Sequence, residues 1–246
     1  MSDGPLYIVS DVHLGAVPES TEAAFHRWLR HAGERAGLLV INGDLFDFWF
    51  EYRSVVPARH LRTLALLAEI VESGTPVLFV GGNHDWWGDD FLRSRIGVDF
   101  HRGAVRIRAC GRSILVAHGD GLGGGDLRYR ALRSTLRSGV TRTLFRWLHP
   151  DLGDAIARRI SGTRRQLASG HRPARRGRST HLAEWAREQL AGDPTLDIVA
   201  LGHAHEPTVT EVAPGRHYVN SGDWVFHRSY VTLGDSGPPL LHEWTG

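Results

Sequence analysis

The chain has 246 residues, of which 41% are hydrophobic and 23% charged, which is typical of globular proteins and unlike disordered, collagenous or coiled-coil chains. One cysteine, Cys110, excludes a disulfide framework and a cysteine-based zinc site. The N-terminus lacks the basic region of a signal peptide, and charged residues interrupt every apolar stretch well before the roughly 18 residues of a membrane span. We therefore expect a cytoplasmic protein that is at most peripheral on the inner membrane.

The N-terminal part of the chain alternates predicted strands and helices. Apolar runs rich in β-branched residues predict strands at Leu6–Ser10, Leu38–Asn42 and Val77–Gly81. Between them, Thr21–Gly33 and Pro57–Ser73 carry apolar residues at helical spacing. This βαβαβ order predicts a parallel sheet that is covered by helices.

The middle of the chain changes character after a predicted hairpin formed by Val105–Ala109 and Ser113–Ala117. Helical, arginine-rich sequence follows, with helices expected at Leu127–Arg137, Val140–Leu148, Leu152–Ser161 and Thr180–Leu190. Strands are expected again at Ile198–Leu201, His217–Asn220 and Arg228–Leu233. We interpret residues 1–246 as one α/β domain that carries a helical insertion, Leu122–Pro194.

Charge is distributed unevenly along the chain. The net charge is +2, and all 29 basic residues are arginine, which excludes Schiff-base chemistry and a Walker-type lysine. From Asp126 to Arg187, fifteen arginines stand against four acidic residues, so this segment carries +11 and the remainder −9. A basic segment on an acidic body favours an anionic partner such as phosphate, nucleic acid or an anionic lipid surface. Such a run is equally compatible with a solvated helical face.

Side chains of metal-binding types follow the predicted strands. They are Asp11 and His13, Asp44 and Asp47, Asn83, His84 and Asp85, His118 and Asp120, and His203 and His205. The carboxyl ends of strands in an open α/β sheet form a ligand crevice, so five loops are expected to meet there. Oxygen and imidazole ligands without thiolate suit Mn, Fe or Zn. Seven ligands from these loops are more than one ion takes from a protein. They therefore favour two ions, with Asp44 as the bridging carboxylate.

Five motifs carry a family resemblance: Asp11-Val-His13, Gly43-Asp44-Leu-Phe-Asp47, Gly82-Asn83-His84-Asp85, His118-Gly119-Asp120 and Gly202-His203-Ala204-His205. In type and order they resemble the motifs of the calcineurin-like metallophosphoesterase family. The resemblance implies a four-layer αββα sandwich and a dinuclear metal centre. We expect Mn²⁺ as the metal, with Fe or Zn as alternatives. The resemblance assigns one ion to Asp11, His13, Asp44 and His205. It assigns the other ion to Asp44, Asn83, His118 and His203.

The same resemblance implies roles for the remaining motif residues. A hydroxide that bridges the ions is expected to attack phosphorus in line. His84 is expected to face the leaving group or a phosphate oxygen, with Asp85 orienting it. Asp47 is interpreted as a hydrogen-bond partner of a ligand imidazole or as a substrate contact.

A narrower resemblance rests on Gly43–Trp49, on His118–Asp126 and on Tyr129. These stretches are similar to the UDP-2,3-diacylglucosamine diphosphatases of lipid A biosynthesis, which implies hydrolysis of a pyrophosphate bond to UMP and 2,3-diacylglucosamine 1-phosphate. Those enzymes carry a helical insertion that serves as a lid. Its apolar side is expected from Leu132, Leu136, Leu144, Phe145, Trp147, Leu148 and Ile156. Its polar side is expected from Asp126, Tyr129, Ser161, Arg164 and Arg165. The best-known members have arginine at the position of His84.

Other interpretations remain open from the sequence. The same centre could act on another phosphodiester, in a nucleotide, a nucleic acid or a phosphoprotein, and a polar cleft is then expected beneath the insertion. A nucleic-acid-binding module built on the basic insertion is a further alternative, although it would not need an intact ligand set. Gly119–Gly124 matches a dinucleotide-binding pattern, but no acidic residue follows about 20 residues later, so we interpret it as a lid hinge and metal loop. Trp49, Trp86 and Trp87 are core residues or the walls of an acyl or nucleobase pocket.

Overall fold

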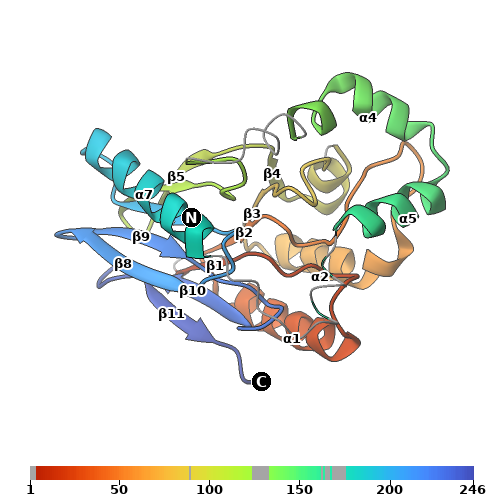
Figure 1. The fold of residues 1–246 in the computed structure, drawn as a ribbon. Coiled ribbons are helices and arrows are strands. Elements are labelled where there is room, and N and C mark those ends of the chain that lie inside the picture. The colour runs from red at the N-terminus through yellow and green to blue at the C-terminus, as the bar shows by residue number, and fades with distance from the viewer. Residues whose placement is uncertain (1–3, 89, 124–132, 162, 164–166, 168–175) are drawn as a thin grey trace.

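The computed structural model describes the chain except for residues 1–3, 89, 124–132, 162, 164–166 and 168–175 (Figure 1). Its strands form two sheets. The six-stranded sheet has the order β11 (Leu240–Glu243), β10 (Ser229–Leu233), β1 (Leu6–Val9), β2 (Leu38–Asn42), β3 (Val77–Val80) and β4 (Asp99–His101). The five-stranded sheet has the order β5 (Val105–Ala109), β6 (Arg112–Val116), β7 (Ile198–Leu201), β9 (Arg216–Asn220) and β8 (Thr208–Ala213).

Parallel pairing dominates the centre of each sheet. β1, β2, β3 and β4 pair in parallel in the first sheet, and β6, β7 and β9 pair in parallel in the second. The antiparallel strands β10, β11, β5 and β8 complete the two sheets. Because parallel strands run in one direction, the loops that follow them open onto the same edge.

Alternation along each central strand separates two apolar layers. In β1, Leu6 and Ile8 face the layer between the sheets, whereas Tyr7 and Val9 face the layer under the helices. The same alternation continues through β2 and β3. Strands that are buried on both faces need apolar residues at every position, which explains the near-continuous apolar runs of the sequence.

Helices complete the layers. The helices α1 (Glu19–Arg35) and α2 (Leu61–Glu72) pack through Phe25, Trp28 and Leu67 on the first sheet. The helix α7 (Arg176–Gly192) packs through Leu182 and Ala186 on the second sheet. The predicted α/β fold of two sheets with covering helices is confirmed.

The segment between β6 and β7 contains the helices α4 (Gly139–Arg146) and α5 (Pro150–Ser161), and it ends with α7. In Figure 1, α4 and α5 stand together on the opposite side of the molecule from α7. Ser138 caps α4, since its side chain accepts a hydrogen bond from the Thr141 amide. Most of the helix expected at 127–137 lies outside the described residues, and the lid role of this segment stays a prediction.

The strands β4, β8 and β11 and the helical turn η2 (Leu92–Ile96) were not expected, whereas the turn η1 (Ala58–His60) lies within the helix expected at Pro57–Ser73. The strands β4, β8 and β11 lie at sheet edges and have mixed polar sequences, so hydrophobic periodicity does not mark them. Within the described part of the chain, no helix is both long and apolar enough to cross a membrane.

Candidate metal centre

Five loops bring the sequence motifs together at the carboxyl ends of β1, β2, β3, β6 and β7. Several of the side chains lie on strained backbone. Asp11, His13, Asp44, His203 and His205 have positive φ angles between 53° and 62°. Such angles are uncommon outside glycine and gather at functional sites, where the surrounding structure enforces them.

Glycines in these loops permit the close approach of the side chains. A Cβ atom on Gly82 would lie 2.2 Å from Asp44 Oδ1, and one on Gly43 would lie 2.3 Å from His118 Nδ1. Any larger residue would therefore displace an acidic or imidazole group of the centre. The presence of Gly43 before Asp44 and of Gly82 before Asn83 therefore has a steric explanation.

One half of the centre consists of Asp11, His13 and His205, whose potential ligand atoms lie within 4.8 Å of one another. His205 Nε2 is 3.1 Å from Asp11 Oδ1. The rings of His13 and His205 stack with their centroids 5.3 Å apart. Asp11 and His13 are buried, and His205 is half-buried.

The other half consists of Asp44, His118 and His203, again within 4.8 Å. His118 Nε2 lies 3.3 Å from Asp44 Oδ2. The same Asp44 oxygen is 4.0 Å from His13 Nε2, so this carboxylate touches both halves. Asn83 lies on the exposed loop between Gly82 and His84.

The donor atoms fit divalent cations. His13 Nε2 and His118 Nε2 are buried and have no hydrogen-bond partner. A buried polar atom without a partner costs about 1–3 kcal/mol, so a native site is expected to satisfy it. Carboxylate and imidazole without thiolate is a donor set suited to Mn, Fe or Zn.

Each of three imidazoles faces an oxygen atom on its outer side. His118 Nδ1 lies 2.9 Å from the Asn42 carbonyl oxygen, and this contact leaves Nε2 toward Asp44. His13 Nδ1 lies 3.6 Å from Asp47 Oδ1.

The third of these imidazoles belongs to His205, whose Nδ1 lies 3.2 Å from Asp223 Oδ2. Sequence reasoning missed Asp223. It follows the strand β9 in the run Ser221-Gly222-Asp223, the same strand-then-acid pattern that marked the other loops.

His84 and Asp85 have partners that differ from the sequence-based expectation. His84 Nδ1 lies 2.7 Å from the Asp47 carbonyl oxygen, and this contact orients the ring. The Asp85 carboxylate instead accepts hydrogen bonds from the amides of Gly82 and Leu45, both at 2.7 Å. Asp85 therefore organises the backbone of the metal loops, and it does not accept a hydrogen bond from the His84 ring.

Mutual charge shapes the titration of the centre. Burial opposes ionisation of Asp44, but the His118 and His84 imidazoles outweigh it and hold the pKa of the Asp44 carboxyl well below its usual range. Burial also opposes protonation of His118, and the Asp44 carboxylate overrides it and raises the pKa of that imidazole. Burial and the Asp44 charge raise the pKa of Asp85 to about 7. The Asp44 carboxylate is therefore ionised, and its negative charge acts on the surrounding imidazoles.

The expected substrate contacts are described in part. Ser161 Oγ donates a hydrogen bond to Asp47 Oδ1 at 2.8 Å, which ties the end of α5 to the metal loops. Asp126, Tyr129, Arg164 and Arg165 lie outside the described residues, so their role stays a prediction.

Asp120, from the motif after β6, binds two arginines that sequence reasoning did not single out. Its Oδ2 accepts from Arg133 Nε at 2.6 Å and from Arg137 Nη2 at 2.7 Å. The Arg137 guanidinium also lies 4.8 Å from the Trp86 ring centroid, a cation–π distance. Arg137 thereby links Asp120, in the segment after β6, to Trp86 in the loop after β3.

Aromatic rings border the centre on the side of α4. Phe145 of α4 lies 4.8 Å from Phe50 and 4.9 Å from Trp87, and Phe48 lies 5.7 Å from Phe145, all as ring-centroid distances. Trp49 packs in the core instead, stacked on Phe46 at 4.7 Å.

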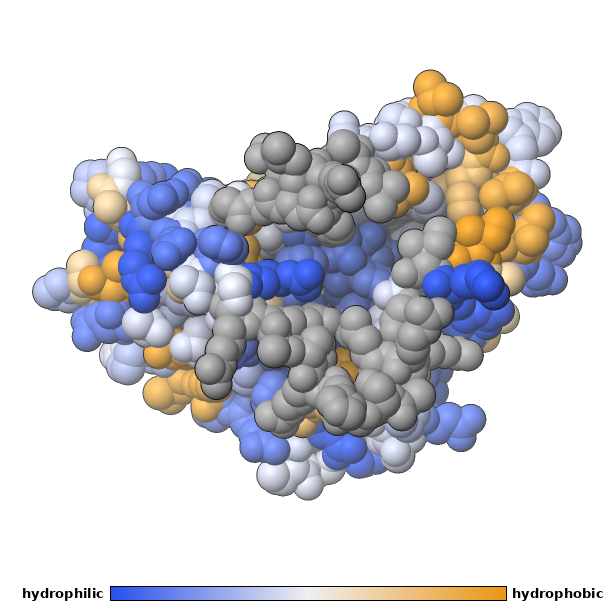
Figure 2. All heavy atoms as spheres, in the orientation of Figure 1, coloured by the Kyte–Doolittle hydropathy of each residue, from blue (hydrophilic) through white to orange (hydrophobic). Residues whose placement is uncertain are grey.

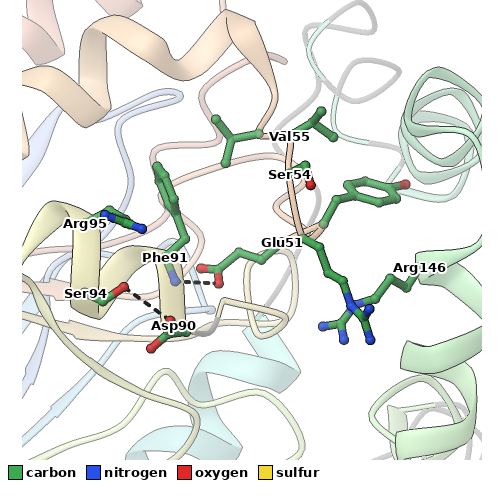
Figure 3. Close-up of a pocket in the computed structure, with 11 residues that line it drawn as sticks. Glu51, Ser54, Val55, Asp90, Phe91, Ser94, Arg95 and Arg146 are labelled. Carbon is green, nitrogen blue, oxygen red and sulfur yellow. Dashed lines mark hydrogen bonds between the residues drawn. The ribbon is translucent and has the colours of Figure 1, made fainter.

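A cavity of about 550 Å³ opens beside this aromatic set (Figure 3). Tyr52, Val55 and Phe91 are among its walls, and Arg95 and Arg146 are among its polar lining. Glu51 also lines it, but its carboxylate is engaged, since Oε2 accepts from the Phe91 amide at 2.9 Å. The cavity therefore combines apolar walls with guanidinium groups.

Comparisons with known proteins place this site in a family. A family model described as calcineurin-like phosphoesterase matches residues 4–207. The chain belongs to this family. A UDP-2,3-diacylglucosamine hydrolase from Porphyromonas gingivalis is 30% identical over 250 residues, covering 92% of this chain and 92% of the relative. One from Ralstonia nicotianae is 32% identical over 238 residues, covering 91% of this chain and 85% of the relative.

Among solved structures, a conserved Streptococcus pneumoniae protein described as a predicted phosphoesterase aligns over 99% of both chains, with 12% identity and a TM-score of 0.41. Membership of the calcineurin-like phosphoesterase family confirms the resemblance drawn from the five motifs. The assignment of individual residues to individual ions stays a prediction, which the convergence of the two halves supports.

Proposed function

We propose that this chain is a metal-dependent pyrophosphohydrolase that cleaves UDP-2,3-diacylglucosamine to UMP and 2,3-diacylglucosamine 1-phosphate. The observation that carries the proposal is the convergence of Asp11, His13, Asp44, His118, His203 and His205 on one centre. The centre occurs in a chain that aligns over nine-tenths of its length with hydrolases named for this substrate. Fold alone would not support a substrate, but site and relatives together do.

The proposed ligand sets are those of the two halves. Asp11, His13 and His205 would hold one divalent ion, and His118, His203 and Asn83 the other, with Asp44 shared. Bound divalent ions supply a nucleophile from water near neutral pH and polarise phosphoryl oxygens. We propose Mn²⁺ as the ion, with Fe or Zn compatible with the same donors.

His84 has the geometry of a proton donor. Its Nδ1 is held by the Asp47 carbonyl, and its Nε2 lies 3.9 Å from Asp44 Oδ2 on the side of the centre. Burial opposes protonation of the ring, but the Asp44 and Asp47 carboxylates raise the pKa of His84. The protonated ring would offer Nε2–H to a phosphoryl oxygen or to the leaving group, which makes it an alternative to arginine at this position.

The aromatic set and the cavity support an acylated substrate. Phe48, Phe50, Trp87 and Phe145 form an apolar wall between the metal loops and α4. Acyl chains gain free energy from burial against such a wall, whereas a nucleic acid backbone does not. The segment Leu122–Pro194 would thus act as the lid that receives the acyl chains.

An exposed face of α4 and α5 supports contact with a membrane surface. Val140, Leu144 and Trp147 follow one another at helical spacing and are 70%, 66% and 86% exposed. Leu152 of α5 adds to the exposed apolar surface visible over these helices in Figure 2. Arginines of the same two helices would pair with anionic headgroups. We propose that this face rests on the membrane that holds the glycolipid.

A hydrolysis assay tests the proposal. The purified protein with Mn²⁺ is expected to release UMP from UDP-2,3-diacylglucosamine far faster than it hydrolyses bis(p-nitrophenyl) phosphate, and EDTA is expected to abolish both activities. Turnover of the simple diester or of single-stranded DNA without release of UMP would contradict the assigned substrate and favour a general phosphodiesterase.

A further inference from the structure

The two halves of the metal centre differ in what stands behind their imidazoles. In the half formed by Asp11, His13 and His205, carboxylates face the outer nitrogens, Asp223 at 3.2 Å and Asp47 at 3.6 Å. Behind His118, in the other half, stands the neutral Asn42 carbonyl. A carboxylate behind a ligating imidazole fixes the tautomer and raises ligand basicity, and a carbonyl does so less strongly.

Asp223 is placed for this task. Its side chain is fully buried, and His205 lies between Asp223 Oδ2 and Asp11 Oδ1, at 3.2 Å from the first and 3.1 Å from the second. The backbone reinforces the contact, because the Trp224 amide donates to the Asp11 carbonyl oxygen at 3.2 Å. The loop after β9 therefore contacts two members of this half, Asp11 through the Trp224 amide and His205 through the Asp223 carboxylate.

The charge of the two halves differs in the same direction. The first half contains the Asp11 carboxylate and is backed by Asp47 and Asp223. The second half has the shared Asp44, with His118 and His203 as its other members, and the nearby Asp120 carboxylate is paired with Arg133 and Arg137. A cation in the first half would face more negative charge at short range, where little solvent screens it.

We propose that the Asp11 half of the centre binds a divalent cation more tightly than the His118 half, and that Asp223 is the positioning residue that creates much of the difference. The inference rests on the metal centre of the proposed function but not on its substrate. Cations are then expected to fill the centre in sequence, first beside Asp11.

The two oxygens of Asp223 suggest a clean substitution. Oδ1 accepts from the amides of Phe226 at 2.6 Å and His227 at 3.2 Å, which is a structural role within the turn. Oδ2 faces the imidazoles of His205 and His227. Asp223→Asn can keep the Oδ1 contacts while presenting an amide N–H₂ group to His205. That group would favour the tautomer whose Nε2 carries a proton and cannot bind a cation.

The experiment is an Mn²⁺ titration of the metal-free protein, with the EPR signal of free Mn²⁺ counting the unbound ion and no substrate present. The wild type is expected to show two classes of site. Asp223→Asn is expected to weaken the tighter class 10- to 100-fold and to leave the weaker class within about threefold. His227→Gln, which alters the other imidazole at Oδ2, is the matched control and is expected to retain both classes.

Thermal melting of the metal-free proteins separates positioning from folding. Asp223→Asn is expected to melt within a few degrees of the wild type. Two equivalent sites in the wild type, an unchanged tight class in Asp223→Asn, or equal weakening of both classes would each overturn the proposal. Because no substrate is present, failure of the assigned hydrolysis reaction would leave this result standing, and the reverse also holds.

Discussion

Asp44 is the residue through which the two halves of the centre meet, since its Oδ2 lies 3.3 Å from His118 and 4.0 Å from His13. Asp44→Ala removes the shared anion from both halves. We expect the purified variant to lose both ions, as measured by elemental analysis. We also expect it to lose its hydrolytic activity, as measured by release of UMP. Asp90→Ala, at an exposed carboxylate outside the centre, is the control and is expected to retain both ions. Two ions per chain in the Asp44 variant would refute the bridging role.

His84 is predicted to act on the reaction more than on metal binding. His84→Ala removes the protonated Nε2 but leaves the halves around Asp11 and His118 intact. We expect full metal content and a kcat that is lower by about 10²–10⁴-fold, the usual range for a positioned proton donor. Steady-state kinetics and metal analysis of one preparation decide the matter, and loss of metal would make His84 a ligand instead.

At the scale of elements, the packing of α1 on α2 buries a histidine. His26 Nε2 lies 2.8 Å from Thr63 Oγ1, and burial together with the nearby Arg62 and Arg30 lowers the pKa of His26 to about 4. The unfolded chain binds a proton near the ordinary pKa of about 6.5, so folding free energy is lost as the pH falls from 6.5 toward 4. We expect a loss of about 1–3 kcal/mol from this group.

Urea denaturation at pH 7.5, 5.5 and 4.5 measures the effect. His26→Gln keeps a partner for Thr63 and is expected to lose stability less steeply with acid than the wild type. His149→Gln, at a histidine that is exposed on the surface, is the control variant. Parallel slopes for all three proteins would show that His26 does not carry the effect.

Elements that are buried on one or both faces could be predicted from the sequence, whereas contacts that depend on tertiary structure could not. Runs such as β1 and β2 were evident because both faces are apolar. The five motifs identified the candidate ligands because strand ends place them together. Asp223 was missed because a lone acid after a strand is common, and its partner His205 is close only in space. The Asp85 contacts were missed because backbone amides carry no sequence signature.

At the scale of the whole molecule, the exposed face of α4 and α5 predicts binding to anionic bilayers. Leu144→Ser with Trp147→Ser removes two exposed apolar groups from this face and should lower affinity for phosphatidylglycerol vesicles about tenfold or more in a sedimentation assay. Leu240→Ser with Leu241→Ser, at exposed positions on β11, is the matched control and should bind like the wild type. Equal binding by both double variants would contradict the proposed orientation.

The strands β6 and β7 are direct neighbours in the sheet, with Ile114 opposite Ile198, although the whole of the segment with α4 and α5 separates them in the chain. Of the helices described in that segment, α7 provides the cover of the second sheet, while α4 and α5 contribute nothing to the two sheets. The helices α4 and α5 thus lie outside the apolar layers of the two sheets that position the metal loops, so changes on their exposed faces are expected to leave the packing of those sheets intact.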